Sequence, residues 1–365
     1  METALAWPEQ AFPLGEVSEW IAAVLALPAA TVTPQTIYAS YTDAPDLRLT
    51  ARLTVTTDSD SRTEVVFKGC RFPLLWASAR FHALVSRYAP GMTPQVLGWT
   101  ESLAGDDCRV IYQPFEGTAV ADHCDSRLLV QTAQTMALIQ HRVAVTDPAT
   151  DKALRVTTAR HIPTLFSRVR TGIRERRQAW DADADGRLSR WLRFPGADVS
   201  AVLEALQPQV DACAVTVEAL GLPLSINHGD LHAGNAIVQP DRTILISDWE
   251  IASLGCPLFS IERLLVDAWS LDTSSQECGP WGYEPGTPTQ PLIRDAYLQA
   301  SGLSHDDVPP TAFAAAMALA TIHEMHREIR WAEMMQWADG NPEWTAQLIS
   351  RLQHHLNDFH RRHTG

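Results

Sequence analysis

Three residues with oxygen-bearing side chains, Asp230, Asn235 and Asp248, lie close together in the sequence. They fall in residues 226–250, which read I-N-H-G-D-L-H-A-G-N-A-I-V, then Q-P-D-R-T, then I-L-I-S-D-W-E. The apolar runs A-I-V and I-L-I predict two short strands joined by a tight Pro-Asp turn, preceded by a polar loop. Such a hairpin is expected to bring the three side chains together at one edge.

A carboxylate, a carboxamide and a second carboxylate are the groups that phosphoryl transfer requires. The reaction needs a positioned hydroxyl nucleophile and hard cations that neutralise the phosphate charge. Asp230 is then the expected base, and Asn235 and Asp248 are the expected metal ligands. Four residues separate Asp230 from Asn235, as in the protein-kinase loop H-R-D-x-x-x-x-N, and Asp248 occupies the place of the Asp in D-F-G.

The same residues carry a family resemblance. H-G-D-L-H-A-G-N followed by D-W-E is similar to the H-G-D-x-H-x-x-N and D-[FW]-E patterns of the aminoglycoside phosphotransferase and choline kinase family. The resemblance implies a two-lobed, protein-kinase-like α+β fold that transfers the γ-phosphate of ATP, with Mg²⁺, to a hydroxyl group. Its parts would be a small antiparallel-sheet lobe at 1–112 that binds the nucleotide, an interlobe linker at 113–117, and a mostly helical catalytic and acceptor-binding lobe at 118–365.

Two other interpretations of the hairpin are less consistent with the sequence. His228, Asp230 and His232 resemble the start of a calcineurin-like phosphatase metal site, but the G-D-x-x-D-R and G-N-H-E motifs of those enzymes are absent from the sequence. A polar hairpin without chemistry is disfavoured because converging carboxylates are costly to desolvate without ligands.

Lys68 is one of only two lysines in the chain, the other being Lys152. It ends the run T-E-V-V-F-K, which is predicted to pair as a hairpin with the strictly alternating strand at 48–56. The resemblance implies that Lys68 matches the strand lysine of V-A-I-K and holds the nucleotide's α- and β-phosphates. The alternative is an edge charge that reaches solvent.

Two features depart from the family pattern. No glycine occurs between Gly15 and Gly69, so the predicted loop at 38–46 cannot be a glycine-rich phosphate cover, and Ser40 and Thr42 are the expected donors in its place.

The second departure concerns the partner of Lys68. No acidic residue lies between Lys68 and Leu84, and Arg80 stands where the family's helix carries a glutamate. Lys68 therefore pairs with a carboxylate elsewhere, or the helix aligns differently, or the site is impaired. Impairment would leave a nucleotide-binding protein with little transferase activity.

Gln113 and Phe115 belong to the segment Q-P-F-E-G between a predicted strand and a predicted helix. The resemblance implies that this linker hydrogen-bonds the adenine edge. An ordinary strand-to-helix turn accounts for the same residues.

The acceptor is expected to meet acidic and aromatic side chains. Glu324 and Glu328 are spaced i, i+4 with Trp331 on the same helix face, where either Arg327 or a cationic substrate would offset their repulsion. Glu250 is expected near the metal or the acceptor. An aminoglycoside is the predicted acceptor, and choline-like amines, amino-acid alcohols, sugars and macrolides are alternatives. Antibiotic resistance is the role that an aminoglycoside acceptor suggests, and a metabolic role is the alternative.

An arginine-rich region spans residues 155–193. Leu165, Phe166, Val169 and Ile173 give it an apolar stripe, so a solvated helix face is expected here in preference to an anionic partner.

Composition limits the partners further. The net charge of −14 argues against nucleic acid and fits a neutral or cationic small substrate. No apolar run is long enough for a membrane span and no signal peptide is evident, so a cytoplasmic location is expected. The six cysteines lack a C-x-x-C pair and are expected to be reduced.

Overall fold

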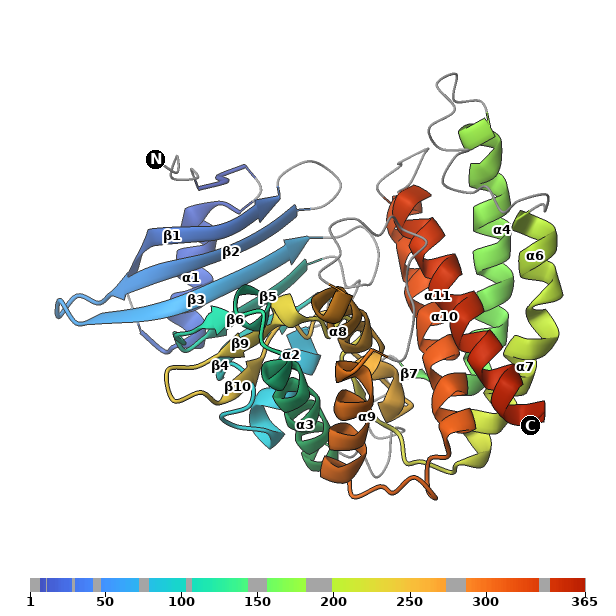
Figure 1. The fold of residues 1–365 in the computed structure, drawn as a ribbon. Helices are drawn as coiled ribbons and strands as arrows, with labels where there is room; N and C mark the ends of the chain where they lie inside the picture. Colours follow the sequence, from blue (N-terminus) through green and yellow to red (C-terminus); the bar gives the residue numbers. More distant parts are fainter. Residues whose placement is uncertain are drawn as a thin grey trace. The chain divides into compact units, whose positions relative to one another are not determined.

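The computed structural model describes residues 7–10, 12–27, 30–41, 47–71, 79–102, 107–143, 156–181, 199–273, 287–334 and 342–364. The chain forms two compact units (Figure 1). Unit 1 comprises residues 1–118 and 237–252, and unit 2 comprises residues 119–236 and 253–365.

Unit 1 is built on an antiparallel sheet of five strands. The strand order is β1-β2-β3-β5-β4, with bounds Thr31–Tyr41, Leu47–Thr56, Arg62–Arg71, Asp107–Tyr112 and Val96–Glu101 respectively. The alternation predicted for β2 is confirmed, since Leu49, Ala51, Leu53 and Val55 are fully buried on one face. Lys68 lies on β3, opposite Thr50 of β2 and Val110 of β5.

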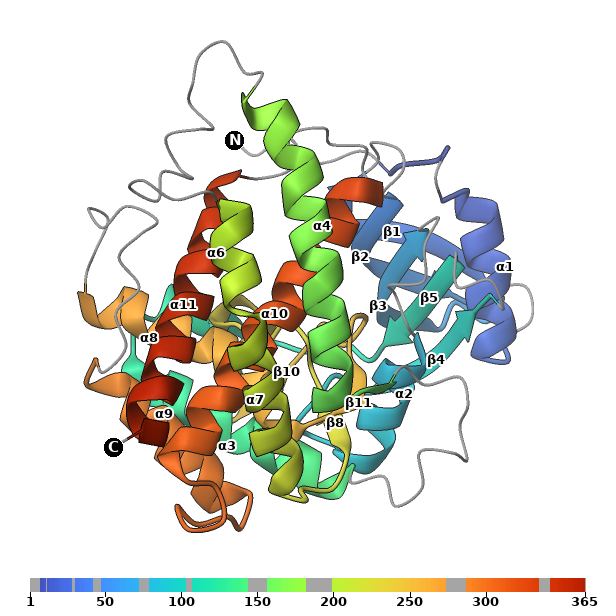
Figure 2. The same ribbon diagram turned by 90° about the vertical axis from the view of Figure 1, so that its right-hand side faces the viewer.

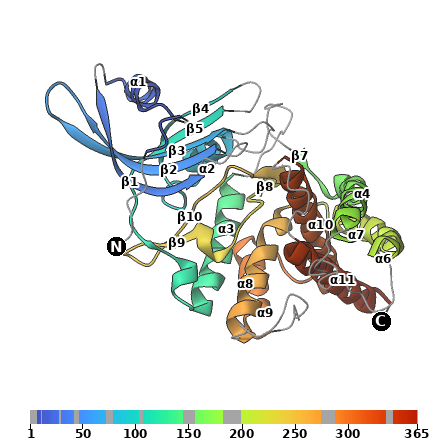
Figure 3. The same cartoon turned by 90° about the horizontal axis from the view of Figure 1, so that it is seen from above.

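Two helices pack on this sheet, on opposite faces (Figure 3). Helix α1, Leu14–Val24, buries Val17 and Ile21 in a core that includes Leu53 and Phe67. Helix α2, Ala79–Tyr88, contacts β4 and β5. Because neighbouring residues of a strand point to opposite faces, Phe67 faces α1 and Lys68 faces the other side.

Strand β1 corrects the prediction of a loop at 38–46. Ser40 pairs with Leu49 and Tyr41 pairs with Arg48, so this part of the segment is an edge strand. Pro34 obscures the strand pattern, and two register shifts interrupt it, which is the irregularity that edge strands tolerate. The side chain of Ser40 and all of Thr42 lie outside the described residues.

The predicted hairpin is confirmed. Strands β9, Ala236–Val238, and β10, Ile244–Ile246, form a small sheet with β6, Thr118–Ala119, in the order β10-β9-β6. Arg242 closes the turn with a φ of 67°, and its backbone N–H donates to the carbonyl of Gln239 at 2.8 Å. The N–H of Ile246 donates to the carbonyl of Met92 at 2.8 Å, which ties β10 to the rest of unit 1.

Unit 2 is mostly helical. Its α-helices are α3 Ser126–Arg142, α4 Ile162–Asp181, α6 Val199–Ala205, α7 Gln207–Ala219, α8 Glu262–Thr273, α9 Thr289–Ala300, α10 Pro310–Met334 and α11 Pro342–Thr364. A small sheet of order β7-β11-β8 joins Val156–Thr157, Ser253–Gly255 and Ser225–Asn227. Helix α10 packs against α4, α7 and α11 (Figure 2). The sheet of unit 1 and the helices of unit 2 confirm the α+β class.

Within the described residues, no helix is long and apolar enough to cross a membrane.

Candidate active site

Asp230 lies in unit 2, on the loop that follows β8. Gly229 precedes it with a φ of +80°, a conformation that glycine adopts without a steric cost. The backbone N–H of Asp230 donates to Nδ1 of His228 at 3.3 Å, and the N–H of Gly229 donates to Oδ1 of Asn227 at 3.2 Å. Side chains of the loop itself therefore hold the turn on which Asp230 stands.

Ser260 braces this loop from the 3₁₀ turn Pro257–Ile261. Its hydroxyl accepts the backbone N–H of His228 at 3.1 Å and donates to Oδ1 of Asn227 at 3.0 Å. The amide of Gln140 also reaches the same hydroxyl, at 3.1 Å. Ser260 thus fixes the start of the loop that carries Asp230. The sequence position of Ser260 does not by itself predict this role.

Asn235 is brought next to Asp230. Its Nδ2 donates to the backbone carbonyl of Asp230 at 2.9 Å, so its amide oxygen is the atom suited to a cation. Asn235 ends the 3₁₀ turn Ala233–Asn235, and Asp267 of α8 accepts the N–H of Ala233 at 2.6 Å. The side chain of His232 accepts the N–H of Gly234 at 3.0 Å, which gives this histidine a structural role.

Two arginines hold the carboxylate of Asp230. Arg263 of α8 and Arg327 of α10 each place a guanidinium nitrogen 3.3 Å from its Oδ1. Arg327 also donates to the carbonyl of Gly229, so it grips the backbone and the side chain of the loop together. This pair, the Asp230 clamp, fixes the direction in which the carboxylate points. The spacing pattern predicted neither arginine as a partner of Asp230.

A buried network of charges supports the clamp from behind. Glu324, 5% exposed, pairs with Arg263 and lies 3.7 Å from Arg327 and 2.7 Å from Arg351 of α11. Arg351, 2% exposed, also pairs with Glu262 of α8. Burial opposes ionisation of Glu324, but the guanidinium groups of Arg351 and Arg263 outweigh it and lower its pKa to about 2. Both oxygens of Glu324 are engaged, so we assign it to this network instead of to the acceptor.

Removal of Arg351 is expected to destabilise the chain severely. In Arg351→Met, Glu262 and Glu324 lose a buried countercharge, and an uncompensated buried charge costs about 3–5 kcal/mol. The free energy of unfolding, measured by urea denaturation, should fall by that amount. Arg361→Met, on the same helix but 68% exposed, is the matched control and should change it by less than about 0.5 kcal/mol. A loss in Arg351→Met no larger than in this control would contradict the role given to the network.

Lys68 lies in unit 1, where two carboxylates meet its ammonium. Nζ of Lys68 pairs with Oδ1 of Asp248 and with Oε2 of Glu250. Arg48 at the start of β2 approaches the other oxygen of Glu250 at 3.6 Å. The side chain of Lys68 is 15% exposed, so it is no solvated edge charge.

The residues after β10 aim these carboxylates at Lys68. Asp248 has a φ of 68°, a left-handed conformation that is unusual for a non-glycine residue and often marks functional sites. Trp249 is fully buried and its Nε1 donates to the carbonyl of Ile246 at 2.9 Å. Trp249 therefore anchors the segment in the core while its two acidic neighbours face Lys68.

The charges of this cluster are strongly coupled. Burial opposes ionisation of Asp248, but Lys68 outweighs it and holds the pKa of Asp248 below its ordinary value. Burial and the negative charge of Asp248 raise the pKa of Glu250 to about 7. Asp248 is thus an ionised hard-oxygen donor, a kind of ligand that Mg²⁺ prefers, and the amide oxygen of Asn235 is of the same hard-oxygen kind.

The partner of Lys68 is therefore found outside helix α2. Arg80 of that helix is turned to Glu101 of β4, at 3.6 Å, and does not replace the missing glutamate. Glu250 supplies the carboxylate instead. Of the three interpretations left open by the sequence, the structure supports pairing with a carboxylate elsewhere.

For the other predicted site residues, the structure shows little beyond their exposure. Gln113 is exposed and Phe115 is partly buried, in the segment after β5. Glu328 is 33% exposed and 3.6 Å from Arg327, and the side chain of Trp331 lies outside the described residues.

Asp248 belongs to unit 1, and Asp230 and Asn235 belong to unit 2, so their convergence stays a prediction. No cluster of three or more His, Cys, Asp or Glu suited to a metal occurs in the part of the chain described.

Comparisons with known proteins identify the family and the fold of the chain. A sequence model described as "Phosphotransferase enzyme family" matches residues 51–277, which include Lys68, Asp230, Asn235 and Asp248. Plasmodium vivax ethanolamine kinase has a similar structure, with a TM-score of 0.54 and 11% identity over 89% of this chain and 81% of that one. Choline kinase from Cryptosporidium parvum Iowa II gives a TM-score of 0.50 and 12% identity over 96% of each chain. A search of curated proteins finds no match. These similarities confirm the protein-kinase-like fold.

Proposed function

Because the chain belongs to the phosphotransferase enzyme family, we propose that it transfers the γ-phosphate of ATP to a hydroxyl group of a small molecule. The observation that carries the proposal is the Lys68 cluster, where a strand lysine is paired with the ionised Asp248 of D-W-E. Family membership confirms the predicted resemblance, and the assignment of individual roles is our proposal.

We assign one task to each part of the site. Lys68 holds the nucleotide's phosphates, with Glu250 and Arg48 fixing its position. Asp248 and Asn235 hold Mg²⁺, which when bound neutralises charge on the phosphates. Asp230 orients the acceptor hydroxyl and accepts its proton. Gln113, Phe115, Ser40 and Thr42 are retained as proposed nucleotide contacts on the family pattern alone.

The Asp230 clamp suits an orienting role. In a largely dissociative transition state the attacking oxygen carries little extra negative charge, so the direction of the hydroxyl group matters as much as the removal of its proton. What the reaction requires is a fixed direction for the hydroxyl, and the clamp supplies that direction from α8 and α10.

The acceptor that we propose is a hydroxylated amine. Around Asp230 lie the carboxylates of Asp267, Glu324 and Glu328, against the two arginines of the clamp. Glu324 is buried and Asp267 accepts the N–H of Ala233, so Glu328, which is 33% exposed, is the carboxylate that we assign to a cationic group, with Trp331 as a proposed neighbour. Aminoglycosides, the predicted acceptors, and amino alcohols such as choline share this chemistry, and sugars and macrolides are the neutral and bulkier alternatives.

A screen of acceptors by ADP release tests this function. With ATP and Mg²⁺, we expect turnover with kanamycin, choline or ethanolamine to exceed turnover with glucose, and EDTA to abolish it. Erythromycin provides a bulky acceptor for comparison. Binding of Mg-ATP without acceptor-dependent ADP release would favour the alternative of a nucleotide-binding protein with little activity. The pairing of Lys68 with Glu250 weakens that alternative, because the missing helix glutamate is what suggested an impaired site.

A further inference from the structure

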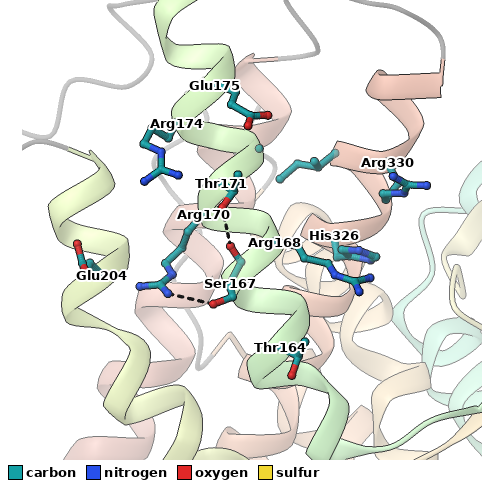
Figure 4. Close-up of a pocket in the computed structure, with 12 residues that line it drawn as sticks. Thr164, Ser167, Arg168, Arg170, Thr171, Arg174, Glu175, Glu204, His326 and Arg330 are labelled. Carbon is teal, nitrogen blue, oxygen red and sulfur yellow. Dashed lines mark hydrogen bonds between the residues drawn. The ribbon is translucent and has the colours of Figure 1, made fainter.

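A cavity of about 530 Å³ lies in unit 2, lined by residues of α4, α6 and α10 (Figure 4). Four arginines and a histidine line it, namely Arg168, Arg170, Arg174, Arg330 and His326, together with two glutamates, Glu175 and Glu204. Neither Asp230 nor the two arginines of its clamp contribute to this lining. The cavity is therefore separate from the site described above.

An excess of arginine here is unexpected in a chain with a net charge of −14. The buried stripe of α4, Phe166, Val169 and Ile173, confirms the predicted apolar face. The arginines of the remaining face, however, line a cavity instead of facing only open solvent. Among the described residues, no carboxylate forms an ion pair with Arg168, Arg170 or Arg174. Arg168 and Arg174 are exposed, as a solvated helix face requires, and they also form part of the cavity wall.

Two polar atoms of this lining are buried without a hydrogen-bond partner among the described residues: Nε2 of His326 and Nε of Arg170. Leaving a buried donor or acceptor unsatisfied is unfavourable, and each such atom in a native structure calls for a ligand or another explanation. Solvent does not reach either atom in the structure, so a bound molecule that offers hydrogen-bonding oxygens would satisfy them only after a small rotation of their side chains.

The helices hold these groups in fixed positions. His326 and Arg330 are one turn apart on α10, and Figure 4 shows Arg168 of α4 beside His326. The helices approach closely at Gly172, where an added Cβ would lie 2.6 Å from Cγ2 of Ile329. The donors of Arg168, His326 and Arg330 are thus presented from two packed helices, with the hydroxyl of Ser167 also in the lining.

We propose that this cavity binds a small molecule through a phosphate group, held by Arg168 and Arg330 with His326 as a third partner. Guanidinium groups match phosphate oxygens in geometry and charge, and several donors on separate helices suit a group with three or more acceptor oxygens. The cavity is larger than one phosphate, so the rest of the ligand lies along α4 toward Arg170 and Arg174. The site goes beyond the proposed phosphotransferase function, which neither requires nor excludes it.

Protonation of His326 is coupled to this binding. Burial and the charges of Arg168 and Arg330 lower the pKa of His326 to about 4, so the ring is neutral at pH 7. The groups that face it are Arg168, Arg170, Arg174 and Glu175 from α4, Glu204 from α6 and Arg330 on α10 itself. A bound phosphate opposes the positive charges and raises this pKa, so binding takes up a proton. The contribution of His326 to affinity should therefore rise as pH falls from 7 toward 5.

Titration calorimetry with inorganic pyrophosphate tests the site, at constant ionic strength and without divalent cations. The double variant Arg168→Gln/Arg330→Gln should raise Kd by on the order of tenfold or more, because charge-assisted hydrogen bonds are lost. Arg168→Lys, which keeps the charge, should lose less. Pyrophosphate also takes up a proton in this pH range, so the ratio of the Kd of His326→Gln to the Kd of the wild type isolates the ring, and this ratio should rise as pH falls from 7 to 5.

Two control variants locate the binding. Arg361→Gln removes one exposed charge from the same unit, and Lys68→Gln alters the proposed nucleotide site in the other unit. Arg361→Gln should leave the Kd of pyrophosphate unchanged, and Lys68→Gln should leave unchanged the binding event that the double variant loses. An unchanged Kd in the double variant, or a loss confined to Lys68→Gln, would overturn the proposal. Circular dichroism of each variant checks that it is folded, and Arg168→Gln alone serves if the double variant is not.

Discussion

Asp230→Asn should lose most of its turnover while it still binds Mg-ATP. The substitution keeps the size of the side chain but removes the carboxylate that accepts the hydroxyl proton, and general-base groups contribute on the order of 10²–10⁴-fold in rate. Arg263 and Arg327 also lose their charged partner, so the loop becomes less well oriented. We expect kcat for acceptor-dependent ADP release to fall by that factor and the Kd of Mg-ATP to stay within about threefold.

Asp306→Asn is a suitable control, because Asp306 is exposed and lies outside the proposed site. It should leave kcat unchanged. Near-normal turnover in Asp230→Asn would remove Asp230 from the mechanism, and a loss of Mg-ATP binding in that variant would show that it acts on the nucleotide instead.

Asp248→Ala should lose both turnover and affinity for Mg-ATP. The variant removes the ionised oxygen ligand and leaves Lys68 with Glu250 as its described carboxylate partner. Loss of one group that stabilises transferring charge costs on the order of 10²–10³-fold in kcat. The Kd of Mg-ATP, measured by calorimetry, should also rise, whereas the Kd of metal-free ATP, measured in EDTA, should change less.

The backbone at Asp248 requires a second variant. Its φ of 68° is disfavoured for alanine but tolerated by asparagine, so Asp248→Asn separates backbone strain from the loss of charge. Both variants should be impaired. Full activity in Asp248→Asn would mean that the backbone conformation at this position is required and the negative charge of the side chain is not.

Local features of the site were predictable from sequence. The A-I-V and I-L-I runs and the Pro-Asp turn specify β9 and β10 through contacts only a few residues apart, and the alternation of β2 specifies which face is buried. The spacing of Asp230 and Asn235 predicted their proximity, because one short loop contains both.

Strand β1 escaped prediction because tertiary pairing outweighs its sequence pattern. Pro34 removes one hydrogen-bond donor and two irregularities break the alternation. The strand forms because β2 offers a long partner, and that long-range contact leaves no periodic pattern in β1 itself.

Partners distant in sequence were the main omission. Glu250 meets Lys68 from nearly half the chain away, and Arg263 and Arg351 meet Glu324 from two other helices. The i, i+4 spacing of Glu324 and Glu328 reveals only neighbours on α10. It therefore suggested a cationic substrate at Glu324, which in the structure is paired with arginines of other helices. Arg327, on the same helix, was the one partner within its reach.

Phosphorus-31 NMR of the reaction product tests the central claim most directly. With ATP, Mg²⁺ and an acceptor that releases ADP, we predict a new phosphate-monoester resonance coupled to the acceptor's carbon-bound protons, absent on the same timescale from Asp230→Asn. Release of free phosphate without an ester, or an ester formed by Asp230→Asn at the wild-type rate, would contradict transfer to a hydroxyl oriented by Asp230.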